Sequence, residues 1–245
     1  MSSQPQPRPV YIAALPREIA GLVRERGWRA EPKLLQRNIH IFEHAQAIIA
    51  CAGMGADRAR LAVEAALALG PATQLVSVGW AGACIHRLRV GQVITPDIVV
   101  DSKTGERFVT DREHDREREV TDGPEVLVTV PSPANVVEKE RLAVGYYASA
   151  VDMEAAAVAR LARAHELPFH AIKAISDDAR FELPDLSSFT TPGGQLREAA
   201  FGFHVALHPS LWRPVIAMAK SSKLAAGNLQ DAIRTHISQH RNRTV

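Results

Sequence analysis

Two carboxylates, Asp152 and Glu154, accompany the alanine-rich run at residues 150–162, AVDMEAAAVARLA. The run predicts the start of a helix, and on helical spacing Glu154 shares a face with Val158 and Leu161. A carboxylate on an apolar face needs a partner, because burying it alone costs several kcal/mol. A polar ligand in a cleft would be such a partner. Helix capping by Asp152 and a first-turn position for Glu154 are the purely structural explanations.

Two more carboxylates follow predicted strands. Glu18 comes after the β-prone run 9–15, PVYIAAL, and Asp177 comes directly after 168–176, PFHAIKAIS. Taken singly, each is better explained as a first-turn or capping acid of the next helix. Ligands collect at the carboxyl ends of the strands of α/β sheets, however, so we expect Glu18, Glu154 and Asp177 to meet at one edge.

The elements that must position these acids alternate along the chain between strand-like and helix-like segments. A glycine-rich turn, GWAGA at 79–83, is predicted between two of the strands. This alternation, with nearly continuous apolar strands, predicts an α/β fold: a single three-layer domain with a mixed, largely parallel central sheet flanked by helices. The remaining predicted strands are 39–53 (one or two), 73–79, 93–101 and 125–130, and the helices are 16–26, 57–69, 135–147, 192–207 and 210–238.

Composition places the chain among ordinary globular proteins. It has 245 residues, 46% of them hydrophobic, and no apolar run long enough to span a membrane. Residues 1–9 are polar and proline-rich without an apolar core, which predicts a disordered leader and not a signal peptide. We therefore expect one domain over 10–245 and a cytoplasmic location.

Charge and cysteine content argue against several classes of partner. The formal net charge of +2 gives no electrostatic case for nucleic acid. Cys51 and Cys84 lack CxxC spacing, and the ten histidines lack metal-binding spacing, so we expect buried thiols and no metal. Residues 102–125 are dense in charges of both signs, which predicts an exposed loop or solvated hairpin.

A family resemblance rests on three segments. ALPREIAGL, VDMEAAAVA and AISDDA, in this order and with glycine turns between them, resemble the nucleoside phosphorylase and nucleosidase superfamily, which includes methylthioadenosine/adenosylhomocysteine nucleosidase. The resemblance spans residues 10 to about 180, and the part from LPDLSSF onward is most similar to the hopanoid-associated branch. It implies an enzyme that cleaves the N-glycosidic bond of a purine nucleoside, with adenine as the expected base, no cofactor, and a homo-oligomeric state.

The resemblance also implies roles for individual residues. Asp177 matches the general acid beside N7 of the purine, and Ser176 would orient it. Glu154 matches the carboxylate that binds the ribose hydroxyls, and Met153 the side chain packed on the sugar. Glu18 matches the acid that activates water in the hydrolytic members. As a general acid Asp177 must hold a proton near neutral pH, which burial or the neighbouring acid at position 178 would favour.

Two further residues are expected beside the substrate. Asp152 would start the helix next to the sugar-binding carboxylate. Trp80 would border the pocket, although a tryptophan beside a glycine turn is more often a packing residue.

The nucleophile is either water or phosphate. The segment SVGWAGA lacks the arginine and the serine with which related bacterial phosphorylases hold phosphate. Phosphate, as a co-substrate, could still be held by the backbone N–H groups of Gly53 to Gly55 and by Arg58. Because Glu18 is present to activate water, hydrolysis is the favoured reaction and phosphorolysis the alternative.

Two hypotheses of other classes stay open. The first is a noncatalytic nucleoside-binding protein on the same fold, which would not need all three acids. The second is an enzyme at a membrane surface, contacted through Trp212 and nearby apolar residues of the basic C-terminal segment. A helix packed on the domain is the simpler explanation of that segment.

Overall fold

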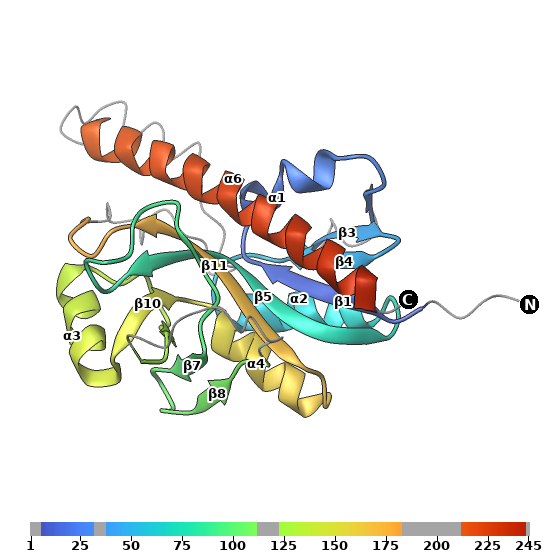
Figure 1. Cartoon of the computed structure of the whole chain (residues 1–245), viewed down its shortest axis with the longest axis horizontal. Helices are drawn as coiled ribbons and strands as arrows, with labels where there is room; N and C mark the ends of the chain where they lie inside the picture. Colours follow the sequence, from blue (N-terminus) through green and yellow to red (C-terminus); the bar gives the residue numbers. More distant parts are fainter. Residues whose placement is uncertain (1–5, 32–37, 112–122, 183–211, 244–245) are drawn as a thin grey trace, which may run out of the picture.

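The apolar runs of the sequence become the strands of one mixed sheet, flanked by helices, as predicted for the fold class (Figure 1). The computed structural model describes residues 6–31, 38–111, 123–182 and 212–243. The predicted helix 192–207 and nearly all of the loop before it lie outside the described residues, as does most of the leader.

In chain order the elements are β1 (Arg8–Ala13), α1 (Pro16–Ile19), a 3₁₀ turn (Leu22–Arg24), β2 (Arg29–Ala30), β3 (His40–His44), β4 (Ala47–Cys51), α2 (Ala56–Leu67), β5 (Ala72–Ala83), β6 (Val93–Ile94), β7 (Ile98–Asp101), β8 (Arg107–Val109), β9 (Val126–Thr129), α3 (Val136–Tyr146), β10 (Ala148–Asp152), α4 (Ala155–Ala164), β11 (Phe169–Asp177) and α6 (Trp212–Arg243).

The central strands pair in parallel and the outer ones mostly antiparallel. The main path of the sheet is β2-β3-β4-β1-β5-β10-β9-β7-β8, with β11 paired to β5 and β6. β1 is parallel to β4 and β5, β5 to β11, and β9 to β7 and β10. The pairs β2–β3, β3–β4, β5–β10, β6–β11 and β7–β8 are antiparallel. The carboxyl ends of β1, β4 and β11 lie at one edge, and the end of β10 meets the end of β11 beside Gly82 of β5, which is where the acids were expected.

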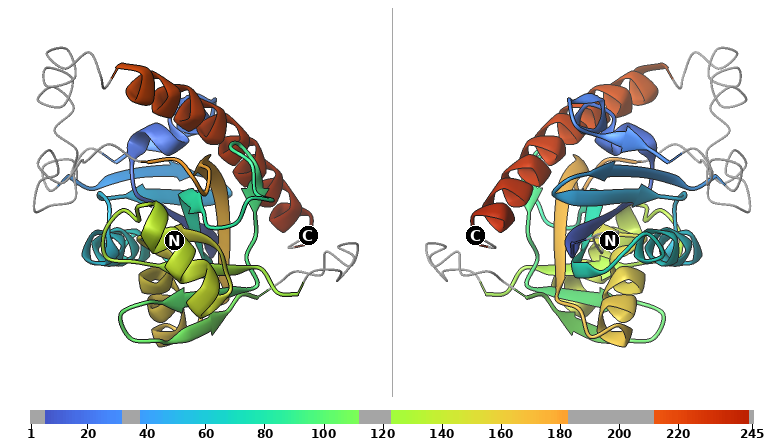
Figure 2. Two further views of the ribbon diagram at one scale, coloured as in Figure 1. Left: turned by 90° about the vertical axis from the view of Figure 1, so that its left-hand side faces the viewer. Right: turned by 90° about the vertical axis from the view of Figure 1, so that its right-hand side faces the viewer.

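Helices cover both faces of this sheet (Figure 2). On one face α2 and α4 pack on a core that includes Val63, Val158 and Leu75. On the other face α6 crosses β11 and β5 and contacts α1. Its buried positions Leu229 and Ile233 recur every four residues, so the helix is amphipathic and packs along one stripe. α3 packs at the end of the sheet on β10 and β9.

The predicted helix start at residue 150 is wrong. Ala150 and Val151 belong to β10, where they pair with β5 and β9, and the helix begins only at Ala155. Strand pairing on both sides outweighs the helix propensity of the alanines. Glu154 therefore occupies the N-cap position at a strand-to-helix junction and not an inward helical face.

The predicted glycine turn at 79–83 is also wrong, since β5 runs straight through it to Ala83. The segment pairs with β11 along this stretch. Because glycine has no side chain, β5 can pass close to the side chains of other elements at these positions. A Cβ on Gly79, whose φ is +141°, would lie 3.3 Å from both carboxylate oxygens of Glu18, and one on Gly82 would lie 2.8 Å from Asp177 Oδ2. The strand thus passes directly beside two of the three acids.

Smaller differences concern the ends of elements. β1 begins at Arg8, inside the segment predicted as leader, and the predicted helix 16–26 divides into α1 and a 3₁₀ turn. The described part of the charged segment includes the turn and the second strand, β8, of the hairpin β7–β8, while residues 112–122 lie outside the description.

The C-terminal helix divides its apolar residues between two environments. Trp212 and Ile216 are about half exposed, at 50% and 54%, whereas Val215 and Met218 line a cavity. Among the described residues, none of the helices combines the length and the apolar character needed to cross a membrane.

Candidate active site

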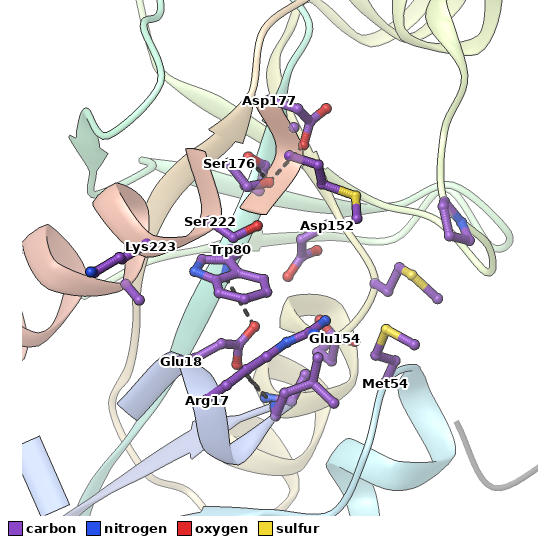
Figure 3. Close-up of a pocket in the computed structure, with 18 of the residues that line it drawn as sticks. Arg17, Glu18, Met54, Trp80, Asp152, Glu154, Ser176, Asp177, Ser222 and Lys223 are labelled. Carbon is purple, nitrogen blue, oxygen red and sulfur yellow. Dashed lines mark hydrogen bonds between the residues drawn. The ribbon is translucent and has the colours of Figure 1, made fainter. Parts of the chain in front are cut away.

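A cavity of about 750 Å³ opens at the carboxyl ends of β1, β10 and β11. Glu18, Glu154 and Asp177 all line it, so residues from three distant parts of the chain share one space (Figure 3). Trp80 and Met153, also expected at the site, belong to its wall. α6 supplies an apolar side of the cavity that the sequence analysis did not assign to the site.

Glu18 is held rigidly by backbone donors. The N–H groups of Ala14 and Leu15 each donate to its Oε2 at 3.0 Å, and the N–H of Trp80 donates to Oε1 at 3.4 Å. The side chain is only 3% exposed, and burial raises the pKa of Glu18 against the opposing effect of these donors and of Lys173. A buried carboxylate with a raised pKa is a competent general base.

Glu154 lies between the helix it caps and the loop after β4. Its Oε1 accepts a hydrogen bond of 2.7 Å from the N–H of Gly55. Burial and the nearby Asp152 raise the pKa of Glu154 to about 7, while Lys173 and the Gly55 N–H act in the opposite direction. Proton binding at Glu154 is therefore expected near neutral pH.

Asp152 lines the cavity, but its carboxylate oxygens accept hydrogen bonds from neighbouring strands and helices. Oδ1 accepts from the Thr129 hydroxyl at 2.6 Å and Oδ2 from the Ala155 N–H at 2.9 Å. Lys173 Nζ lies 2.8 Å from the same Oδ2. These contacts join β9, β11 and the start of α4. Asp152 therefore lies at the start of the helix, as expected, and bonds to its first N–H group.

Lys173 was missed by the sequence analysis. It is 0% exposed, and although burial lowers the pKa of a lysine, Asp152, Glu154 and Glu18 together raise the pKa of Lys173 above its usual value. Its ammonium partly neutralises the cluster of acids. A signal was present, because this lysine interrupts the otherwise apolar strand PFHAIKAIS.

Both carboxylate oxygens of Asp177 accept hydrogen bonds from side chains. The Ser176 hydroxyl donates to Oδ1 at 2.6 Å, which is the contact the sequence analysis expected. Lys139, from α3, donates to Oδ2 at 2.5 Å and was not expected. Asp178, named as a possible neighbour, is exposed and its carboxylate accepts instead from the N–H of Arg180.

Comparison with known proteins places this arrangement in a family. The sequence matches the family described as the phosphorylase superfamily over residues 9–134 and 131–201. The chain belongs to the phosphorylase superfamily. The hopanoid-associated branch within it stays a prediction. No curated protein sequence matches this superfamily member significantly.

Solved structures show the same fold. The 5′-methylthioadenosine/S-adenosylhomocysteine nucleosidase of Neisseria meningitidis, in complex with methylthio-immucillin-A, is 20% identical, with 93% of this chain and 97% of that chain covered and a TM-score of 0.66. The 5′-methylthioadenosine nucleosidase of Arabidopsis thaliana is 17% identical, with 95% of this chain and 96% of that chain covered and a TM-score of 0.66. The futalosine hydrolase of Helicobacter pylori is 17% identical, with 94% of this chain and 98% of that chain covered and a TM-score of 0.62.

The residues expected to hold phosphate in this superfamily member are engaged elsewhere. The N–H of Gly53 donates to the Ala14 carbonyl at 3.0 Å, and the N–H of Gly55 donates to Glu154. Arg58 Nε donates to the Ala52 carbonyl at 2.6 Å, and Arg58 is not among the described residues that line the cavity. The loop after β4 is thus organised around Glu154.

A different guanidinium lies in the cavity. Arg17 lines it, with its guanidinium carbon 5.0 Å from the centre of the Trp80 ring, a cation–π contact (Figure 3). Trp80 therefore has both a packing partner and a face on the cavity.

Cys51 and Cys84 are buried free thiols, as expected. Within the described ranges, no group of three or more His, Cys, Asp or Glu side chains is arranged to hold a metal ion.

Proposed function

We propose that this chain hydrolyses the N-glycosidic bond of a purine nucleoside. The observation that carries the proposal is the meeting of Glu18, Glu154 and Asp177 on one cavity. Membership of the phosphorylase superfamily supports it, as do structural neighbours named as nucleosidases and a futalosine hydrolase. The presence of all three acids argues against a noncatalytic nucleoside-binding protein.

The reaction needs three kinds of assistance. As the bond between C1′ and the purine nitrogen breaks, positive charge develops on the sugar and negative charge on the base. Glu154 would bind the ribose hydroxyls and stabilise the positive sugar. Asp177 would donate a proton to N7 of the departing base, and Glu18 would take a proton from the water that attacks C1′. The products are the free base and the free sugar, and the proposed reaction uses no cofactor.

The layout of the site suits this division of roles. In Figure 3 Ser176 and Asp177 lie at one end of the group of labelled residues and Glu18 at the other, with Asp152 and Trp80 between them. A general acid for the base and a general base for water must act on opposite sides of the sugar carbon. The separation of Asp177 from Glu18 supports different partners for the two acids.

The wall formed by α6 bears on the 5′ substituent. Val215, Met218 and Ala226 line this side together with Met54 and Met153. An apolar 5′ group, such as a methylthio group or a larger hydrocarbon, would lose less hydration there than a charged one. Adenine as the base is proposed from the family resemblance.

Phosphorolysis is the second candidate, and Arg17 is the observation that favours it. A guanidinium is the natural bidentate partner of phosphate, and Arg17 borders the same cavity as Glu18. In that case phosphate, not water, would attack C1′ and the product would be a sugar 1-phosphate.

The test follows base release from methylthioadenosine, adenosine and adenosylhomocysteine, with and without phosphate. The proposal expects release in phosphate-free buffer, with free sugar as product, and a loss of about 100-fold or more in Glu18→Gln. Leu15 and Ala14 would still contact the glutamine oxygen, so Glu18→Gln keeps the shape of the site.

Strict dependence on phosphate, with a sugar 1-phosphate as product and little effect of Glu18→Gln, would replace hydrolysis by phosphorolysis. No release from any purine nucleoside, together with tight binding of one, would favour the noncatalytic alternative.

A further inference from the structure

Lys139 has a buried ammonium group that the mechanism above does not use. Its side chain is 1% exposed, and it reaches from α3 to the end of β11. Nζ donates to Asp177 Oδ2 at 2.5 Å, to the Asp178 carbonyl at 2.9 Å and to the Phe181 carbonyl at 3.5 Å. An ammonium has three N–H donors, so these three oxygens use all of them. Lys139 therefore acts on Asp177 and does not need to touch a substrate.

The local backbone is built to admit this contact. Asn135 caps α3 by accepting the Glu138 N–H at 2.9 Å, which places Lys139 and Leu142 on the buried side of the helix. Opposite, β5 has Gly82, where a Cβ would lie 3.2 Å from Lys139 Cε and 2.8 Å from Asp177 Oδ2. A side chain at position 82 would thus push the pair apart.

Few other titratable groups face this pair. Cys84, just beyond β5, is buried, and burial raises the pKa of its thiol to about 12, so the thiol stays neutral through the working pH range. Glu138 pairs with Arg141 on the exposed side of α3, and Asp178 is exposed. Within the described part of the chain, the ammonium of Lys139 is the cation that pairs with Asp177.

We propose that Lys139 is a positioning residue for Asp177: through its contact with Oδ2 it fixes the orientation of the carboxyl group that faces the departing base. The inference rests on the proposed N-glycosidic cleavage. Lys139 and the Ser176 hydroxyl together hold both oxygens of Asp177, so the loss of Lys139 leaves the carboxyl group free to turn. A misplaced acid slows the chemical step more than it weakens substrate binding.

The experiment compares kcat and KM for the full chain and three variants, with methylthioadenosine as substrate. Lys139→Met removes the N–H donors and the charge and keeps much of the volume. We expect kcat to fall about tenfold, because the carboxyl group is less well oriented, with a smaller change in KM.

Two variants act as controls. Lys139→Arg keeps the positive charge and N–H donors and should recover most of the kcat that Lys139→Met loses. Arg141→Met removes a positive charge two residues away on the same helix, from a side chain that is 74% exposed, and should leave kcat and KM unchanged.

An unchanged kcat in Lys139→Met, or a fall in kcat that Lys139→Arg does not recover, would overturn the proposal. If Lys139→Met does not fold, Lys139→Gln is measured against the same criterion. If the unaltered chain cleaves no nucleoside, the proposed function fails and this role fails with it, a result distinguishable from an active enzyme whose Lys139 variants keep the original kcat.

Discussion

At the scale of single residues, the acids of the cavity lie beside two buried lysines. Asp177 is paired with Lys139 at 2.5 Å, and Lys173 lies among the remaining acids. Breaking a buried ion pair leaves an uncompensated charge and is strongly destabilising. The protonation of Glu18 and Glu154 is therefore linked both to catalysis and to the stability of the fold.

Glu154 gives a prediction for stability against pH. Its pKa is about 7 in the folded chain against an ordinary value of 4.5, so between these pH values the folded state binds more protons than the unfolded state. The contribution of Glu154 to the free energy of unfolding should be greatest below about pH 4.5 and should decline as pH rises through 7, by about 3 kcal/mol.

Glu154→Gln should remove that part of the decline, and chemical denaturation at pH 5 and pH 8 measures it. The comparison is made against the unaltered chain because Glu18, whose pKa is also raised, adds a slope of the same sign. Equal slopes in the two proteins would show that Glu154 is ionised throughout this range.

The acids of the site could be named from the sequence, but not their partners. Asp177 and Glu154 stand in recognisable segments at the ends of predicted strands. Lys173 was visible as a lysine inside an apolar strand, and its burial was predictable from that. Lys139 lies on a helix with other charged residues, and only the packing of α3 against β10 and the Asn135 cap determine which way it points.

At the scale of elements, local pattern predicted most strands and helices and failed where strands are paired on both sides. β10 contains alanines that favour helix, and β5 contains glycines that favour turns, yet both continue as strands. In each case hydrogen bonding to neighbouring strands outweighs a propensity difference of about 1 kcal/mol or less per residue. Such pairings are formed by segments far apart in the sequence.

Gly82 tests the close approach of β5 to the site. Gly82→Ala would place a methyl group 2.8 Å from Asp177 Oδ2, so we expect base release to fall about tenfold or more while the chain still folds. Gly145→Ala, in α3 with open space around its Cα, is the matched control and should raise stability by about 0.5–1 kcal/mol at unchanged activity. Equal activity of the two variants would mean that Asp177 tolerates displacement.

At the scale of the whole molecule, the site exists because separate parts of the chain share one edge of the sheet. α6 crosses the molecule (Figure 2), and its side chains line one side of the cavity. Its Gln230 side chain donates to the backbone carbonyl of Glu18 at 2.9 Å, so the C-terminal helix is joined to the element that carries the proposed base. The sequence predicted that the acids meet at the ends of strands, but not the wall that encloses them, because the apolar stripe of a helix shows that it packs on the domain and not where it packs.

The most direct test of the central claim is a crystal structure of the chain with a non-hydrolysable purine nucleoside analogue. The account predicts ribose hydroxyls on Glu154, N7 of the purine at Asp177, and a water molecule or cation-mimicking group beside Glu18. An analogue bound outside this cavity, or bound within it with its sugar turned away from Glu154 and its base away from Asp177, would contradict the account.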